Sequence, residues 1–168
     1  MKNIRFVLLG ELVLLVLMLV LCIGSNFRAY LWFLDLPSII IIVLFLILGL
    51  LIMGEWKDFV RSFSVGIKTY SLLDLKNIIG AVDAAQKLTI YGALFAIITS
   101  GVMIMGSLDD LGSLGPKLAV CFLAGFYAII LEFFFLPLKL NAERKMNEEM
   151  DFEEMDFEEK TGSADEHI

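Results

Sequence analysis

Two apolar segments decide the fold: residues 89–106, TIYGALFAIITSGVMIMG, and residues 116–137, PKLAVCFLAGFYAIILEFFFLP. They contain a single acid, Glu132, and both carry small residues at steps of three and four, which lie on one face of a helix. In lipid, helices associate through close backbone approach, so a stripe of small residues marks the side that faces another helix. The two segments therefore predict a pair of helices at the centre of a membrane bundle.

The two stripes define the predicted helix-packing or pore-lining faces. The face of the first segment consists of Gly92, Ala96, Thr99, Met103 and Gly106. The face of the second segment consists of Lys117, Cys121, Gly125, Ala128 and Glu132. The two earlier apolar segments are mostly Leu, Ile, Val and Phe on all sides, so we expect those helices to lie outside this pair and to face lipid.

Composition indicates a polytopic membrane protein. Hydrophobic residues make up 59% of the chain, and the mean hydropathy is +0.84. A helix needs roughly 20 apolar residues to cross a bilayer, and four segments approach or exceed this length: residues 6–23, 37–53, 88–105 and 118–138. The sequence thus predicts an all-α fold with four transmembrane helices in residues 1–140.

The distribution of basic residues predicts the orientation. If both termini are cytoplasmic, every lysine and arginine except Arg28 and Lys117 lies on the cytoplasmic side. Cytoplasmic loops of membrane proteins carry an excess of these residues. We therefore expect both termini to be cytoplasmic.

Two segments are expected to lie on the cytoplasmic side. Loop 54–87 shows apolar residues at helical spacing from Trp56 to Tyr70, which predicts an amphipathic helix along the membrane interface. A second helix, from Leu72 to Lys87, should run directly into the third span. The acidic tail, residues 141–168, contains the tandem repeat MDFEE-MDFEE and is predicted to be disordered, with a short helix or a docking motif for a basic partner as the alternative.

Few residues of the sequence could take part in catalysis, metal binding or proton transfer. The only histidine, His167, lies next to the end of the chain, and the two cysteines, Cys22 and Cys121, lie inside spans, so we expect no enzyme, no metal site, no cofactor and no nucleic-acid partner. An acid inside a span is costly unless it faces protein or water. Thr99, Ser100 and Glu132 are therefore the candidates for an ion pathway. The alternatives are hydroxyls bonded to their own helix and a glutamate paired with a neighbouring base.

Two motifs resemble a known family. Residues 33–38, FLDLPS, with Asp35 and Pro37, open the second span. Residues 108–120, LDDLGSLGPKLAV, lead into the fourth span and contain Asp109, Asp110, Gly115 and Pro116. Together with Tyr127 and Pro137, these motifs resemble the MotA branch of the MotA/TolQ/ExbB family of proton-channel subunits.

The resemblance implies a multi-pass subunit in the inner membrane of a bacterium. It implies a homo-oligomeric ring, a pentamer in such families, around a separate single-span membrane partner that carries the ion-binding acid. The function implied is an ion-driven motor or an energy-transducing channel. Two pore-facing threonines of the family correspond to Ala124 and Gly125 here. A non-conducting oligomeric scaffold, with the acidic tail as its recruiting element, is therefore the alternative.

Overall fold

The computed structural model describes residues 4–24, 30–31, 33–106, 108 and 111–165. Five helices lie within these ranges: α1 (Ile4–Ile23), α3 (Leu36–Met53), α4 (Trp56–Ser62), α5 (Leu72–Met105) and α6 (Leu111–Asp165). All but α4 are long and apolar enough to cross a membrane, and each contains one of the predicted spans. The prediction of an all-α, multi-pass membrane protein is confirmed.

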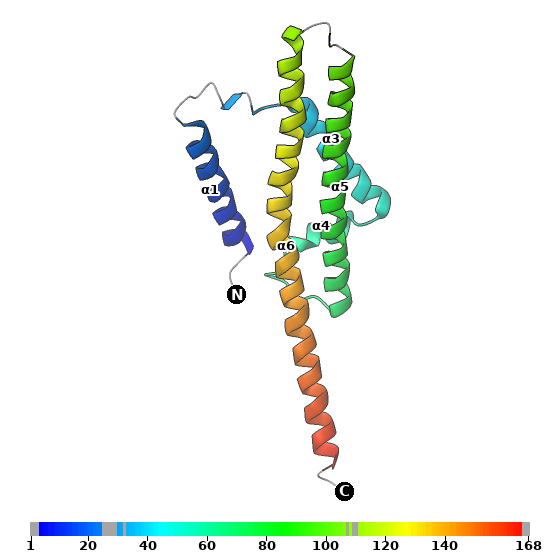
Figure 1. The fold of residues 1–168 in the computed structure, drawn as a ribbon. Helices are drawn as coiled ribbons and strands as arrows, with labels where there is room; N and C mark the ends of the chain where they lie inside the picture. The colour runs from blue at the N-terminus through cyan, green and yellow to red at the C-terminus, as the bar shows by residue number, and fades with distance from the viewer. Residues whose placement is uncertain (1–3, 25–29, 32, 107, 109–110, 166–168) are drawn as a thin grey trace.

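The bundle is organised around α5 and α6, which run antiparallel and share the largest interface (Figure 1). The other two membrane helices are added at different places, since α3 packs mainly on α5, whereas α1 lies beside α6. Residues at steps of three and four form the buried face of α5: Leu75, Ile78, Ala81, Val82, Ala85, Thr89, Gly92, Ala93, Ala96 and Ser100. Most of its members within the membrane segment are small, so the neighbouring helices approach closely.

The expected position of α1 agrees with the structure, but that of α3 does not. No residue of α1 from Phe6 to Ile23 is buried. In contrast, α3 buries a stripe against the bundle: Ser38, Ile42, Leu46 and Leu50. The prediction that the second span faces lipid was therefore wrong for one of its sides. An apolar sequence on all sides does not reveal which side packs, because lipid and protein interiors accept the same residues.

Two glycines bring α3 and α5 together. A Cβ atom on Gly92 of α5 would lie 3.1 Å from the Cα of Ile42 and 3.0 Å from the Cβ of Phe45. On the facing helix, a Cβ atom on Gly49 would collide with the side chain of Leu88. A larger residue at Gly49 would need the Leu88 side chain to move, whereas one at Gly92 would press on the backbone of α3 itself.

The ends of α3 and the start of α5 follow from local sequence. Asp35 caps α3, its carboxylate accepting a hydrogen bond from the backbone N–H of Ser38 at 3.2 Å, and a proline, Pro37, occupies the first turn. Gly54, at φ 78°, ends the helix in the left-handed conformation. Ser71 caps α5, which then continues for 34 residues without interruption. The prediction that the second part of loop 54–87 runs directly into the third span is confirmed.

The amphipathic helix of this loop is shorter than predicted, because α4 ends at Ser62 and not at Tyr70. Serine side chains compete for the backbone there: the Ser62 hydroxyl donates to the carbonyl of Phe59 at 2.6 Å, and the Ser64 hydroxyl donates to that of Arg61 at 2.9 Å. Beyond them the chain turns back onto the bundle. Val65 is buried in a small cluster with three residues of the long helices: Leu75, Ile78 and Ala142.

The acidic tail is helical as far as Asp165, as the continuation of α6 (Figure 1). Composition predicts disorder for residues 141–168, with a short helix or a docking motif as the alternative, whereas the structure continues α6 through residues 141–165. The physical reason is that a helix already formed in the bundle removes the cost of nucleation. Side-chain pairs such as Lys145 with Glu148, at 3.6 Å, also lie along this segment. His167 lies outside the described residues.

We predict that Gly92→Ala destabilises the bundle, because the added methyl group meets backbone and side-chain atoms of α3. Overpacking of this kind costs about 1–3 kcal/mol. Thermal unfolding of the purified protein in detergent should show a lower midpoint. Gly101→Ala is the matched control, since a Cβ atom there meets nothing within 4 Å. Equal midpoints for the two variants would contradict the close α3–α5 contact.

Candidate functional site

A small cavity of about 250 Å³ lies between α3, α5 and α6. Five residues with polar side chains, from all three helices or their caps, stand around it, although its wall is almost entirely apolar: Asp35, Ser38, Thr99, Ser100 and Lys117. The apolar part of the lining includes Pro37 and Ala96. The structure therefore brings two candidate pathway residues, Thr99 and Ser100, next to the motif that opens the second span.

Tyr127 ties this motif to α6. Its hydroxyl donates a hydrogen bond to the carbonyl of Phe33 and accepts one from the backbone N–H of Asp35 at 2.7 Å. The contact joins residues more than ninety positions apart in the chain. These two hydrogen bonds fix the position of the start of α3 relative to α6. They use only the backbone of Asp35, so its carboxylate caps α3.

Thr99 and Ser100 lie in different environments. The Thr99 hydroxyl donates to the carbonyl of Phe95 in its own helix at 2.8 Å, and its side chain is exposed. Ser100 is buried, with 8% of its surface exposed. Ser100, not Thr99, continues the buried face of α5, although both residues line the cavity.

The predicted face of the third span is covered within the chain only in its first part. Gly92 and Ala96 are buried, whereas Thr99, Met103 and Gly106 are exposed. On a regular helix Met103 points in nearly the same direction as Gly92 and Ala96. Its exposure therefore shows that the neighbouring helices do not cover α5 at that level.

The predicted face of α6 lies along α5 over most of its length. The Cys121 thiol is 3.7 Å from the carbonyl oxygen of Ile97, and Ala128 packs in a cluster with Ile42 and Ala93. Gly125 lies opposite the side chain of Ile97. Ala124, one of the two positions where the family has a threonine, is completely buried within the chain.

Glu132 lies further along α6 and turns toward α5. One oxygen, Oε2, accepts a hydrogen bond from Nε2 of Gln86 at 2.8 Å. The other oxygen, Oε1, is buried and has no hydrogen-bond partner. About one helical turn from Gln86, the hydroxyl of Thr89 is also buried and unpaired. Buried polar atoms without partners are rare in proteins, so this part of the α5–α6 interface stands out as a polar site within an otherwise apolar contact.

Sequence reasoning missed Gln86 as the partner of Glu132. Gln86 lies just before the third span, residues 88–105, and outside the small-residue faces that predict helix contacts. Its position one turn before Thr89, in a helix expected to be continuous, was the available signal. Only the pairing of α5 with α6 shows that Gln86 and Glu132 lie at the same level.

An ion pair lies at the end of this interface from which the C-terminal tail continues. Lys139 Nζ lies 2.7 Å from an oxygen of Asp83 on α5 and 3.9 Å from an oxygen of Glu143 on its own helix. The remaining motif residues play smaller parts in the structure: Gly115 and Pro116 lie in the first turns of α6, and Pro137 is buried within it. Asp109 and Asp110 lie outside the described residues.

We predict that Tyr127→Phe destabilises the junction of α3 and α6. The change removes a hydroxyl that serves both Phe33 and Asp35, and an unpaired buried backbone group costs about 1–3 kcal/mol. Thermal unfolding in detergent measures the effect. Tyr91→Phe, at an exposed ring, is the control and should unfold at the temperature of the parent. A midpoint for Tyr127→Phe equal to that of the control would show that this hydroxyl does not hold α3.

Neither metal ligands nor similarity to known proteins identifies a function for this site. Within the described residues, no group of three His, Cys, Asp or Glu side chains could hold a metal ion. Comparison of the chain with family models, curated proteins and solved structures finds no match. By the length and hydropathy of its helices, the chain is a multi-pass membrane protein with polar groups at two levels of its α3–α5–α6 core.

Proposed function

We propose that the chain is the ring-forming subunit of an ion-driven motor or energy-transducing channel, with protons as the ion and a bacterial inner membrane as its location. In this proposal several copies, a pentamer by the family resemblance, surround a separate single-span partner that carries the ion-binding acid. The observation that carries the proposal is Glu132, an acid inside a membrane helix with one oxygen buried and unpaired.

The cost of burying this acid argues for a functional role. A charged side chain within a bilayer is expensive, and such residues commonly mark ion or proton pathways. Glu132 lies seven residues before Lys139, which corresponds to about 10 Å along the helix from the cytoplasmic end. Its one partner is a neutral amide, Gln86, which can stay hydrogen-bonded whether the carboxyl group is charged or protonated. The site therefore suits an acid that gains and loses a proton.

The polar residues at Glu132 and those at the cavity lie far apart along the helices, and this separation supports the presence of a partner chain. Gln86 and Ser100 are fourteen residues apart on α5, which is roughly 21 Å of helix. Between these levels the core of the chain contains mainly alanines: Ala93, Ala96, Ala124 and Ala128 are all buried. A proton would need further polar groups to cross this region, and a partner helix or a neighbouring copy could supply them.

One observation favours the alternative, a non-conducting scaffold. Ala124 is fully buried, so this position lines no route even if the ring forms. In that proposal the helical tail recruits a cytoplasmic protein through exposed apolar residues such as Phe152 and Met155. A five-residue repeat turns by about 140° per repeat at 3.6 residues per turn. Phe152 and Phe157 consequently lie on different sides of the helix, and a partner would have to wrap around it.

We predict that Glu132→Gln greatly lowers proton flux. The substituted amide can keep a hydrogen bond to Gln86 but cannot exchange a proton, so the fold should survive. Positioned acid–base groups typically contribute about 10²–10⁴-fold to proton-transfer rates. The measurement is proton uptake by vesicles that contain the assembly purified with its partner.

Glu143→Gln is the matched control, because this acid lies at the cytoplasmic end and contacts only Lys139 among the ion pairs described. It should conduct like the parent. Flux from Glu132→Gln equal to that of the parent would eliminate Glu132 from the route, and no flux from the parent itself would favour the scaffold.

We also predict that the tagged chain, purified from its native membrane, has the native mass of a homo-oligomer with a substoichiometric single-span protein. The expectation of a homo-oligomer rests on the family resemblance, because the small-residue face of α5 is already buried within the chain. Native mass spectrometry measures both subunit number and partner. A homo-oligomer that carries only soluble proteins on its tail would support the scaffold, and a monomer would contradict both proposals.

A further inference from the structure

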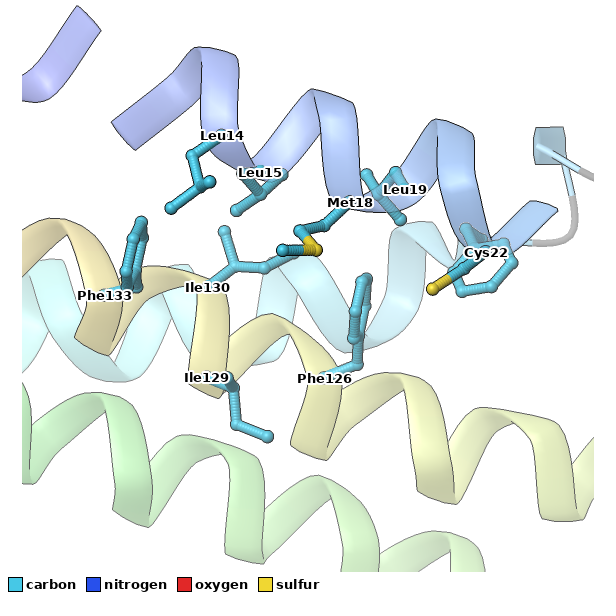
Figure 2. A pocket seen from close by; sticks show the side chains of 10 residues that line it. Leu14, Leu15, Met18, Leu19, Cys22, Phe126, Ile129, Ile130 and Phe133 are labelled. Carbon is cyan, nitrogen blue, oxygen red and sulfur yellow. The ribbon is translucent and has the colours of Figure 1, made fainter. Parts of the chain in front are cut away.

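A crevice of about 420 Å³ runs along the seam between α1 and α6 (Figure 2). One side of α1 lines it: Leu14, Leu15, Met18, Leu19 and Cys22. One side of α6 faces them: Phe126, Ile129, Ile130 and Phe133. On each helix these residues recur at the spacing of a single face. We call this space the α1–α6 crevice.

The crevice stays open because neither face contains a Gly, Ala or Ser, and Cys22 is the one small side chain, at the end of α1. Membrane helices close on one another where Gly, Ala or Ser lets the backbones approach. α5 meets both of its neighbours in that way: its Gly92 lies against α3, and its Ala93 packs against α6. In the α1–α6 seam, leucine, isoleucine and phenylalanine side chains hold the two helices apart. A second hollow of about 440 Å³ continues the seam toward the N-terminus of α1.

The lining determines what can occupy this space. None of the side chains named carries an oxygen or a nitrogen, and water needs two to four polar partners to be stable in a cavity. An empty space would lose dispersion contacts along its whole wall. A volume of about 420 Å³ lies within the range of roughly 300–1,000 Å³ of small-molecule sites. The occupant is therefore apolar and present in the membrane.

The volume and length of the crevice indicate whether its occupant is a lipid chain or a protein helix. A helix is about 10–12 Å across with its side chains, so it would fill the volume of the crevice in only roughly 4–5 Å of its length. A single extended chain is thinner. Leu14 and Cys22 are eight residues apart, which is about 12 Å along α1. One leaflet of a bilayer core is about 15 Å thick, so the crevice has nearly the length of one acyl chain.

We propose that the α1–α6 crevice binds an acyl chain of a membrane phospholipid, in the leaflet that contains the C-terminal half of α1. The chain fills the space that the bulky side chains leave, and it links α1 to the rest of the bundle. α1 has no buried residue of its own between Phe6 and Ile23, although Leu8 packs against the core cluster, so a lipid chain in the seam adds to a small direct contact with α6. This inference is independent of ion conduction.

Photolabelling tests the proposal. The full chain is reconstituted in vesicles of phosphatidylethanolamine and phosphatidylglycerol that contain a small fraction of phosphatidylcholine with a diazirine on one acyl chain. After illumination, mass spectrometry locates the adducts. We expect several-fold more adducts on crevice residues such as Met18 and Phe126 than on lipid-facing residues elsewhere, such as Leu17 and Ile98.

Two matched variants sharpen the result. Ile129→Trp places a larger side chain in the crevice, at a residue that is 69% exposed and can change without disturbing the core. It should lower labelling of Met18 and Phe126 several-fold. Ile98→Trp, at a residue of α5 that is 64% exposed, should leave that labelling unchanged.

Three outcomes would overturn the proposal. The first is equal labelling of the crevice and of the Leu17 and Ile98 surfaces, which indicates ordinary surrounding lipid. The second is unchanged labelling in Ile129→Trp. The third is an unlabelled crevice whose residues are instead cross-linked to a second copy of the chain. Even if Ile129→Trp fails to fold, the pattern of adducts on the parent protein decides the question.

Discussion

The structure depends on close contact between α5 and its two neighbours. Inside a bilayer, burial of apolar side chains supplies no drive for helix association, because lipid is as apolar as the side chains themselves. Stability then comes from dispersion contacts between closely spaced backbones and from the few hydrogen bonds between helices. Gly49, Gly92, Ala93 and Ala128 permit that spacing, and Tyr127 adds a hydrogen-bonded link between α3 and α6. Every other feature of the bundle is arranged around this contact.

The same contact determines where polar groups are tolerated. The Glu132–Gln86 pair lies inside the α5–α6 interface near the end from which the C-terminal tail continues, where Lys139 and Asp83 form an ion pair. At the opposite end, Asp35, Ser100 and Lys117 stand around a small cavity between three helices. The alanines between these two groups allow tight packing but their side chains offer no hydrogen bonds. The polar side chains of the core are therefore gathered near its two ends.

α1 shows what happens where the small residues are missing. Its face toward α6 is as apolar as the faces of the other helices, yet the two helices leave a crevice between them. The difference lies in side-chain size and not in hydrophobicity, because large side chains prevent the backbones from meeting. A helix attached in this way is linked to the surrounding lipid more closely than to the protein core.

Local composition and periodicity predict the class of the protein, the four spans, the continuity of α5 and a small-residue face on each of its central helices. A single helix already expresses these features. Contacts between helices were needed to show which side of α3 is buried, that Gln86 meets Glu132, that Ser100 and not Thr99 continues the core face, and that α4 ends at Ser62. The structure also shows the tail as a helix, where composition favours disorder. Each of these features depends on a contact with residues distant in the sequence, or on a helix that starts in a preceding segment. Apolar residues pack equally well against lipid and against another helix, so the sequence does not show which neighbour they contact.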